Sequence, residues 1–347
     1  MTADQNPHQD PEDMSSDGAG GTGGPGEAGG TGGTGGTDVH RSGFVALVGR
    51  PNVGKSTLTN ALVGEKVAIT SSKPQTTRRA IRGIVTREDA QVILVDTPGV
   101  HRPRTLLGER LNDLVRETLS EVDVVGFCLP ADQKIGPGDR FICEDLVEMR
   151  SGRRGPRVVA VVTKTDLVTR DALAEHLMAV DQLMDFDEIV PISAVKGEQI
   201  DVLLEVIARQ LPEGPQLYPD DQLTEESRDD RISELIREAA LEGVRDELPH
   251  SIAVVVEEVV EVDPDGDAFT PVEPGTGRLI VRASLFVERD SQKGIIIGKG
   301  GARLKEVGSR ARAEINHLIG RKVHLDLRVK IAKEWQRDPK QLGRLGF

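Results

Sequence analysis

Two kinds of hydrophobic pattern follow one another along the chain, and they predict two folded parts. In residues 43–211, short apolar runs alternate with longer amphipathic runs. Apolar strands separated by helices are typical of a doubly wound, mainly parallel α/β sheet. The strands are expected at 44–48, 81–86, 92–95, 124–128, 158–162 and 189–192. The helices are expected at 57–63, 107–119, 139–149, 171–183 and 200–210.

The pattern beyond residue 223 predicts a smaller α/β module with the order α-β-β-α-α-β. Its expected elements are a helix over 224–247, strands over 251–262 and 278–288, a short helix ending at 297, a helix from the glycines 298–301 to about 317, and a strand over 323–331. A polar, turn-rich segment separates the first two strands and is expected to be a hairpin loop. Residues 212–223 join the two parts as a linker or a short docking segment.

Residues 1–37 show neither pattern. They are rich in Gly, Thr, Asp and Pro, and such a composition cannot form a packed core. We therefore expect a disordered tail. The expected boundaries are 1–41 for the tail, 42–212 for the first domain, 213–230 for the linker and 231–347 for the second domain.

Composition and charge refine this picture. The length of 347 residues favours two domains, and the formal net charge of −13 alone argues against nucleic-acid binding. However, residues 277–347 hold 17 Lys and Arg against 7 Asp and Glu, which indicates a basic binding module or a solvated basic face. The two cysteines, Cys128 and Cys143, lie among apolar residues and suggest a reducing cytoplasm. We find no run of 18 apolar residues and no signal-peptide pattern, so we expect neither a membrane span nor a leader.

The candidate chemistry begins at residues 49–56, whose sequence GRPNVGKS fits the phosphate-binding loop G-x-x-x-x-G-K-[ST]. A strand precedes the loop and a helix follows it, which is the context that this motif requires; the alternative is a chance glycine turn. Lys55 would reach the β- and γ-phosphates, and Ser56 would hold Mg²⁺. The residues expected to contact the nucleotide here are Gly49, Arg50, Pro51, Asn52, Val53, Gly54, Lys55, Ser56 and Thr57.

A second segment, Asp96-Thr97-Pro98-Gly99, follows an apolar strand. A carboxylate at that strand end could hold Mg²⁺, and the Gly99 N–H could meet a γ-phosphate, which would make the segment a switch. The alternative is an ordinary Asp-Pro-Gly turn. Val100 follows where Ras-like proteins carry a water-orienting Gln, and a Val side chain cannot do this. Upstream, Thr76 or Thr77 would be the switch threonine that reaches Mg²⁺.

Two further segments point to guanine. Asp166, in Thr163-Lys164-Thr165-Asp166, could accept hydrogen bonds from the guanine N1–H and amino group, which adenine does not offer. Lys164 could pack beneath the base. The backbone of Ser193-Ala194-Val195 could donate to guanine O6. Each segment follows a strand, at the edge where ligands bind in such sheets. Arg78 and Arg79 could contact phosphate or a partner, or simply be solvated.

A glycine-rich loop marks the second module. Residues 298–301 (Gly298-Lys299-Gly300-Gly301) fit GxxG, the KH-domain loop that lets the nucleic-acid backbone approach closely. The alternative is a turn in a structural domain. The expected RNA contacts are Lys293, Gly294, Ile297, Gly298, Lys299, Gly300, Gly301, Arg303 and Lys305. We expect single-stranded RNA, because such modules bind splayed bases, and no DNA. Trp335 could cover RNA, but core or interdomain packing is favoured.

The nucleotide motifs resemble a translation-factor-type small GTPase domain, with one departure: Thr163 replaces the usual Asn, which implies weaker nucleotide affinity. In similar GTPases with a hydrophobic residue after the switch glycine, a phosphate-loop Asn helps to bind K⁺. Asn52 matches that position, although it could instead stabilise a turn.

Over residues 43–347 the chain resembles the Era family of bacterial ribosome-assembly GTPases. The matching segments are GRPNVGKSTL at 49–58, KPQTTRR at 73–79, DTPGVHRP at 96–103, PISAVKG at 191–197 and GIIIGKGG at 294–301. The resemblance implies GTP and Mg²⁺ as cofactors, GTP hydrolysis stimulated by RNA, and binding to 16S ribosomal RNA near its 3′ end during small-subunit maturation. It also implies a cytoplasmic protein, in some members peripheral on the inner membrane, and we expect a monomer.

Three alternatives remain open from the sequence. Val100 supports a non-hydrolytic RNA-binding assembly factor that uses nucleotide as a structural ligand. An ATP-driven RNA remodeller is opposed by Asp166. A GTPase that acts on another RNA, as in tRNA modification, lacks supporting Cys or flavin chemistry.

Overall fold

The computed structural model describes residues 39–71, 77, 81–99, 105–150, 155–244, 248–263 and 277–347, with the backbone alone at 81 and 250. The expected tail over 1–41 lies outside these residues, apart from its last three. Of those three, Arg41 already begins the first strand, so the folded part starts one residue before the expected boundary.

The first domain contains a six-stranded sheet. Its strands are β1 (Arg41–Val48), β2 (Ile81–Thr86), β3 (Ala90–Asp96), β4 (Val124–Pro130), β5 (Arg157–Thr163) and β6 (Glu188–Pro191). They lie in the order β2-β3-β1-β4-β5-β6, and only β2 runs antiparallel to its neighbour. The predicted doubly wound, mainly parallel sheet is confirmed.

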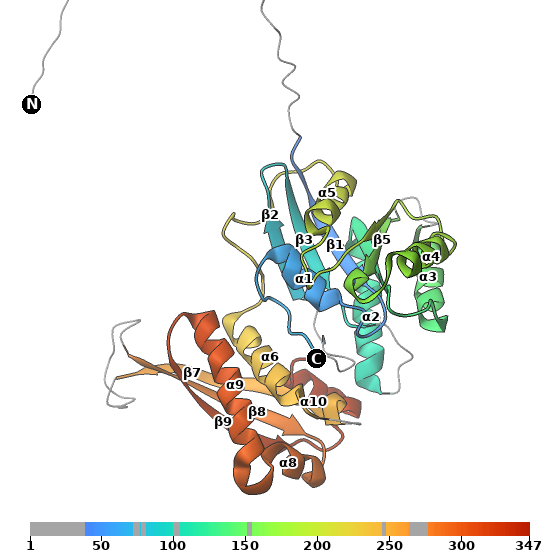
Figure 1. Cartoon of the computed structure of the whole chain (residues 1–347). Helices are drawn as coiled ribbons and strands as arrows, with labels where there is room; N and C mark the ends of the chain where they lie inside the picture. Colours follow the sequence, from blue (N-terminus) through green and yellow to red (C-terminus); the bar gives the residue numbers. More distant parts are fainter. Residues whose placement is uncertain are drawn as a thin grey trace, which may run out of the picture. The chain divides into compact units, whose positions relative to one another are not determined.

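Helices cover both faces of this sheet (Figure 1). They are α1 (Lys55–Val63), α2 (Leu106–Glu121), α3 (Pro137–Arg150), α4 (Arg170–Asp181) and α5 (Ile200–Gln210). Successive side chains of a strand point to opposite faces. In β1, Val45 and Leu47 therefore pack with α1 and α5, whereas Ala46 and Val48 pack with α2, α3 and α4. This double burial explains why the strand sequences are apolar without alternation.

The segment after α5 is docked on the first domain. The Ser42 N–H donates to Pro212 O at 3.1 Å, and the Ile84 N–H donates to Leu223 O at 2.9 Å. Between these points the amide oxygen of Gln91 accepts from the Leu217 N–H at 2.7 Å and its nitrogen donates to Tyr218 O at 2.8 Å. Of the two expectations for 212–223, the structure shows the docking segment.

The helix predicted over 224–247 is wrong at both ends, because α6 spans Arg228–Leu241. The Thr224 hydroxyl donates to Arg82 O at 2.7 Å, which extends the docked segment. The helix begins only after Ser227, whose Oγ accepts from the Asp230 N–H at 3.1 Å and so caps the first turn.

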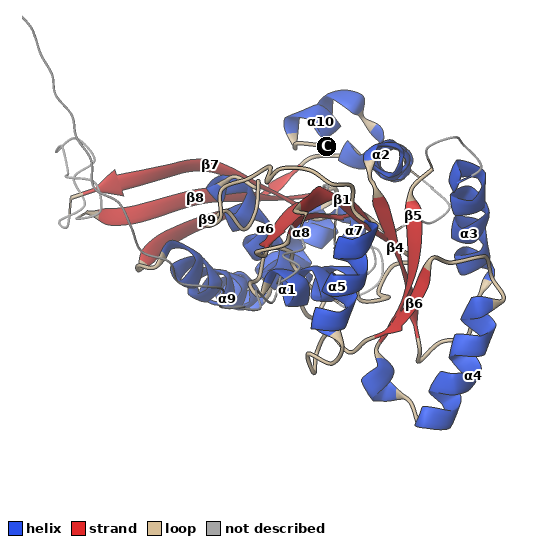
Figure 2. Ribbon diagram, turned by 90° about the horizontal axis from the view of Figure 1, so that it is seen from above, coloured by secondary structure: helices blue, strands red, loops and turns tan. Residues whose placement is uncertain are grey.

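The second domain has the predicted order of elements, apart from one additional short helix before its first strand. After α6 come α7 (Leu248–Ser251), β7 (Ala253–Val262), β8 (Arg278–Val287), α8 (Asp290–Ile297), α9 (Ala302–Ile319) and β9 (Val323–Ile331). The sheet order is β7-β8-β9, with β7 antiparallel and β9 parallel to β8. Helices α6 and α9 pack together on one face of it, around Ile236, Val281 and Ile315 (Figures 1 and 2).

The C-terminal residues pack onto both domains. They form η3 (Trp335–Arg337) and α10 (Pro339–Arg344), which lies beside α2 in Figure 2. Trp335 is fully buried, donates from Nε1 to Ser251 O at 3.0 Å and stacks on Phe347 at 5.3 Å between ring centroids. Leu107 and Leu111 of α2 belong to the same cluster. The packing role favoured for Trp335 is confirmed.

Candidate GTP site and nucleic-acid interface

The predicted nucleotide segments meet at the carboxyl edge of the six-stranded sheet. The phosphate loop follows β1, Asp96 ends β3, Thr163 ends β5, and Ser193 follows β6. A cavity of about 260 Å³ opens beside the phosphate loop at this edge. It is lined by Pro51, Asn52, Gly54, Lys55, Ser56, Thr57, Thr70, Ser71, Thr77, Gly99 and Lys164. The sequence did not single out Thr70 and Ser71; their only signal was their place shortly before the switch threonines.

The phosphate loop is held in a conformation that exposes its backbone to this cavity. Asn52 and Gly54 have positive φ angles of 63° and 105°, and α1 begins directly afterwards at Lys55. The N–H groups at such a helix start favour an anion. Lys55 Nζ donates to Gly49 O at 3.0 Å and to Arg50 O at 3.1 Å, so its ammonium group lies against the loop.

Gly99 allows the switch segment to approach the loop. A Cβ atom at this position would lie 2.9 Å from both the ring Cγ and the backbone nitrogen of Pro51, so a larger residue would force the two segments apart. Thr97 and Pro98 are buried beneath, and the Thr97 hydroxyl donates to Leu47 O at 2.7 Å. These two residues hold the segment in place and do not line the cavity.

Thr163 fixes the phosphate loop from the neighbouring strand. Its hydroxyl is buried and donates to Val53 O at 2.6 Å. Part of the role expected for the usual Asn, holding the loop, is therefore served by the shorter hydroxyl side chain. The departure from the common motif leaves this contact intact.

Three oxygen atoms gather beside Lys55 at the inner end of the cavity. Thr77 Oγ1 lies 3.1 Å from Ser56 Oγ and 3.2 Å from Asp96 Oδ2. Adjacent oxygen ligands of an octahedral Mg²⁺ lie about 3.0 Å apart. The other carboxylate oxygen, Asp96 Oδ1, is buried and has no hydrogen-bond partner among the described residues. Both distances from Thr77 Oγ1 are therefore close to the spacing of neighbouring Mg²⁺ ligands.

Burial shapes the charges in this cluster. It lowers the pKa of Lys55, an effect that the Asp96 charge partly offsets. It raises the pKa of Asp96, which Lys55 and hydrogen bonds from Ser56 and Thr77 partly offset. Both shifts reflect the cost of removing a charged group from water. A bound cation would stabilise the ionised form of Asp96, and a bound phosphate would stabilise the charged form of Lys55.

The two segments that were predicted to select guanine also meet. Asp166 Oδ1 accepts from Ser193 Oγ at 2.7 Å, which orients the carboxylate. Lys164 has a left-handed backbone (φ 58°), and its Nζ lies 3.7 Å from Asp132 Oδ2. The sequence did not single out Asp132, although it follows β4 at the same edge. Thr165 donates its N–H to Ile192 O, Ala194 packs against the core, and Val195 is 80% exposed.

A buried carboxylate holds the phosphate loop from its other side. Arg50 Nε donates to Asp139 Oδ1 at 2.7 Å. Asp139 is fully buried at the start of α3, where its second oxygen accepts from the Gly136 N–H at 2.8 Å. No local pattern in the sequence indicates this pair, because the two residues are 89 positions apart.

Some predicted residues cannot be placed. Thr76 and Val100 lie outside the described residues, as do Arg78 and Arg79. Between the two switch-threonine candidates, the structure therefore positions Thr77 alone, and it places Thr77 with Ser56 and Asp96.

The second candidate site is the glycine loop and the groove beside it. Residues Lys299–Gly301 form a short turn between α8 and α9, and a Cβ atom at Gly300 would have no atom of the described residues within 4 Å. A groove of about 500 Å³ follows along α9 and β9. Its lining residues are Gly301, Leu304, Lys305, Gly308, Ser309, Arg312, His324, Leu325, Asp326 and Leu327. Ser309, Arg312 and His324 were missed; the spacing 305–308–312 along one helix face was the available signal.

Not all predicted RNA contacts line this groove. Arg303 Nη2 donates to Glu242 O at 2.7 Å and to Ala240 O at 3.3 Å, so its guanidinium caps the C-terminus of α6. Lys299 and Gly300 are exposed at the loop, Gly298 is half-buried there, and Lys293, Gly294 and Ile297 lie on α8 away from the groove lining. The structure therefore brings together the loop, Gly301 and Lys305, and gives Arg303 a structural contact.

Comparison with known proteins gives the same two-part description. Residues 44–164 match the family model of 50S ribosome-binding GTPases, and residues 247–336 match the KH domain. GTPase Era of Mycolicibacterium paratuberculosis is 64% identical over 308 residues, which cover 88% of this chain and 99% of that protein. The chain belongs to the Era family of GTPases.

Two Era crystal structures share this fold. One is Era in complex with MgGDPNP and nucleotides 1506–1542 of 16S ribosomal RNA; it is 36% identical, with a TM-score of 0.81. The other is an Aquifex aeolicus Era variant bound to GDP·AlF₄⁻, 37% identical with a TM-score of 0.80. Each comparison covers 88% of this chain and 99% of the other. The chain is thus a GTPase with a C-terminal KH domain, and the non-hydrolytic alternative is set aside.

Proposed function

We propose that this protein is a GTP-driven switch that binds 16S ribosomal RNA through its KH domain and assists assembly of the small ribosomal subunit. The observation that carries the RNA part is the glycine loop opening onto a groove that presents Lys305 and Arg312. Exposed glycines admit a nucleic-acid backbone, and the cationic side chains suit its phosphates. The Era relative bound to 16S ribosomal RNA supports this choice of ligand.

At the nucleotide site we propose that the phosphates of GTP bind the loop and Lys55, and that Ser56, Thr77 and Asp96 hold Mg²⁺. The ion would supply charge stabilisation for phosphoryl transfer. Lys55 and the loop N–H groups would stabilise the same developing charge, and the Gly99 N–H would sense the γ-phosphate. Asp166, oriented by Ser193, would select guanine. Excess ATP should therefore fail to displace bound fluorescent GDP, whereas GTP should displace it.

We also propose that K⁺ assists hydrolysis through Asn52. This side chain is exposed at the cavity, and its left-handed backbone places it at the turn of the loop. Faster turnover in K⁺ than in Na⁺, abolished by Asn52→Ala, is the expected result. Equal rates in the two salts would leave Asn52 with a turn-stabilising role.

The cellular setting follows from the family and stays a prediction. We propose that the protein is a monomer and works in the cytoplasm. We also propose peripheral attachment to the membrane, which cell fractionation would test. Among the described residues, no helix is long and apolar enough to span a bilayer.

The test of RNA binding uses a pair of matched glycine variants. Gly300 (φ 60°) in the loop and Gly320 (φ 75°) at the far end of α9 both have left-handed backbones and open surroundings. Gly300→Asp should weaken binding of an RNA matching the 3′ end of 16S ribosomal RNA at least tenfold, because a carboxylate would face the phosphates. Gly320→Asp should bind as the wild type does. Equal binding by both variants, or equal affinity for DNA of the same sequence, would contradict the proposal.

A further inference from the structure

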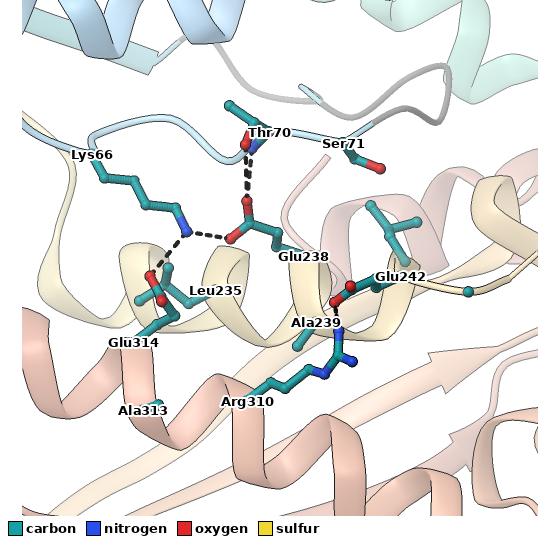
Figure 3. A pocket seen from close by; sticks show the side chains of 12 residues that line it. Lys66, Thr70, Ser71, Leu235, Glu238, Ala239, Glu242, Arg310, Ala313 and Glu314 are labelled. Carbon is teal, nitrogen blue, oxygen red and sulfur yellow. Dashed lines mark hydrogen bonds and ion pairs between the residues drawn. The ribbon is translucent and has the colours of Figure 1, made fainter. Parts of the chain in front are cut away.

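One helix of the KH domain lies between the RNA groove and the GTPase domain. Along α9, one face carries Lys305, Ser309 and Arg312, which line the groove. The opposite face carries Arg310 and Glu314, which line a separate cavity of about 670 Å³ between α6, α9 and the GTPase domain (Figure 3). A movement of α9 would therefore displace residues that line the groove and residues that line this cavity.

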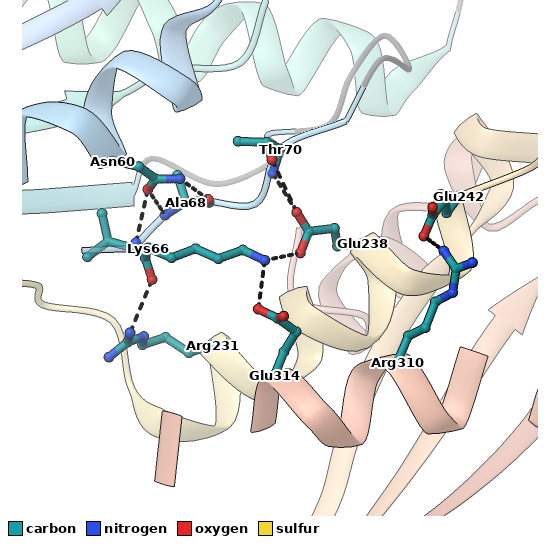
Figure 4. A network of polar contacts seen from close by, with 10 residues as sticks. Asn60, Lys66, Ala68, Thr70, Arg231, Glu238, Glu242, Arg310 and Glu314 are labelled. Carbon is teal, nitrogen blue, oxygen red and sulfur yellow. Dashed lines mark hydrogen bonds and ion pairs between the residues drawn. The ribbon is translucent and has the colours of Figure 1, made fainter. Parts of the chain in front are cut away.

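A charge cluster joins the two domains at that cavity. Lys66 Nζ, from the segment after α1, lies 2.6 Å from Glu238 Oε2 of α6 and 3.0 Å from Glu314 Oε2 of α9 (Figure 4). The Glu238 side chain is only 18% exposed. Burial alone would lower the pKa of Lys66, but hydrogen bonds and charges from Glu238 and Glu314 outweigh it and raise the pKa. The lysine is thus firmly charged and paired.

The second oxygen of Glu238 holds the backbone of the GTPase domain. Oε1 accepts from the Thr70 N–H at 2.9 Å and from Thr70 Oγ1 at 3.3 Å (Figure 4). Thr70 and its neighbour Ser71 line the nucleotide cavity on one side and the interdomain cavity on the other. A single KH-domain carboxylate therefore contacts the wall that separates the two cavities.

The held segment is also attached to the phosphate-loop helix. Asn60 of α1 accepts from the N–H groups of Val67 and Ala68 at 3.0 and 2.8 Å, and donates to Ala68 O at 2.8 Å. Residues 67–70 are thus fixed at one end by α1 and at the other by Glu238. Among the described residues, the hydrogen bonds of Thr70 are made to Glu238, so its removal would leave Thr70 without them.

We propose that Glu238 is a positioning residue for the nucleotide site, supplied by the KH domain. It fixes Thr70 and Ser71 against the cavity, so that nucleotide affinity depends on how α6 and α9 are placed. The positioning itself needs only the nucleotide site. The consequence for RNA, that occupancy of the groove changes nucleotide affinity, rests on the function proposed above.

The experiment compares Glu238 of α6 with Glu242, the residue that follows the last residue of this helix, in the full chain. Glu242 lies one turn beyond Glu238, lines the same cavity and pairs with Arg310, a contact made within the KH domain. We would measure dissociation of fluorescent GDP and of a fluorescent GTP analogue from Glu238→Ala and Glu242→Ala, with thermal unfolding recorded for each. Glu238→Ala should release the GTP analogue at least fivefold faster than wild type, within the usual range of coupling between sites. Glu242→Ala should match wild type.

A conservative variant separates positioning from general destabilisation. Glu238→Gln keeps an acceptor for the Thr70 N–H but loses the charge that pairs with Lys66, so its release rate should lie between wild type and Glu238→Ala. Equal release rates for Glu238→Ala and Glu242→Ala would overturn the inference, whatever the RNA results. Absence of RNA binding by the wild type would instead contradict the proposed function. The release rates of the Glu238 and Glu242 variants would still test the role of Glu238.

Discussion

The hydroxyl of Thr163 offers the sharpest test of how the nucleotide site is built. Thr163→Val removes one oxygen atom and keeps the shape of the side chain. The hydroxyl donates to Val53 O at 2.6 Å, and both residues are at most 2% exposed. The substitution therefore leaves the Val53 carbonyl without this donor in a place that water does not reach readily.

An unsatisfied buried acceptor costs about 1–3 kcal/mol. If the phosphate loop stays in place, the loss appears as a lower free energy of unfolding of the nucleotide-free protein. If the loop relaxes, the protein keeps its stability and nucleotide must reorder the loop, so GDP affinity falls, by tenfold for each ~1.4 kcal/mol. The two losses, measured by urea unfolding and by fluorescent GDP titration, should together come to about 1–3 kcal/mol.

A matched control is Thr59→Val. Thr59 is also fully buried, but its hydroxyl donates to Lys55 O at 3.2 Å, a carbonyl that also lies within the hydrogen-bonded ladder of α1. This control should leave GDP affinity unchanged. Wild-type stability and wild-type affinity in Thr163→Val would refute the assignment of Thr163 to the loop. Thr163→Asn, which restores the commoner residue, should bind GDP at least as tightly as wild type.

Three further predictions concern other parts of the chain. Asp139→Asn should weaken GDP binding severalfold, because Arg50 loses its charged partner while the side-chain shape is kept; fluorescent GDP titration measures this, and unchanged affinity would contradict it. Burial raises the pKa of Cys128 to about 12, so at pH 8 roughly one thiol in ten thousand is ionised. A thiol reagent should modify Cys128 only after denaturation, and rapid labelling of the native protein would refute its burial. Trp335→Ala should lower the free energy of unfolding by about 3–5 kcal/mol, as seen in urea titration, with a smaller loss for Trp335→Phe.

The raised pKa of Cys128 also predicts how its contribution to the free energy of unfolding changes with pH. The folded protein holds the Cys128 proton more tightly than the unfolded chain, whose thiol titrates near its ordinary value of 9.0. Its contribution to stability is therefore complete below about pH 9 and is lost as the pH rises toward 12.

The sequence predicted which segments lie together at the proposed nucleotide site because each of these segments is local. The loop 49–56, Asp96 and Asp166 each follow an apolar strand, and parallel strands bring their carboxyl ends to one edge. The strand periodicity also predicted β2 and β9 to the residue. Short motifs with a fixed place in a sheet can therefore be identified from the order of the residues alone.

Contacts between distant segments were not predictable in this way. No local pattern indicates the contact of Arg50 with Asp139 or that of Glu238 with Thr70. Both contacts depend on how helices pack on the sheet and on each other. Arg303 has another contact that the sequence did not predict. Its charge next to GxxG suggested RNA, but the turn into α9 directs its guanidinium to carbonyls of α6. The end of the docked segment was not predictable for the same reason. The Thr224 hydroxyl donates to Arg82 O of β2, and α6 therefore begins only at Arg228.

We propose that GTP hydrolysis and RNA binding are linked in this one molecule. The most direct measurement is GTP turnover of the full chain in K⁺ buffer, with and without an RNA matching the 3′ end of 16S ribosomal RNA, and with Lys55→Ala as the blank. We predict that the RNA accelerates turnover in wild type and in Gly320→Asp, and that Gly300→Asp loses the acceleration while keeping its basal rate. Turnover that depends on Lys55 but is the same with and without this RNA would contradict the account.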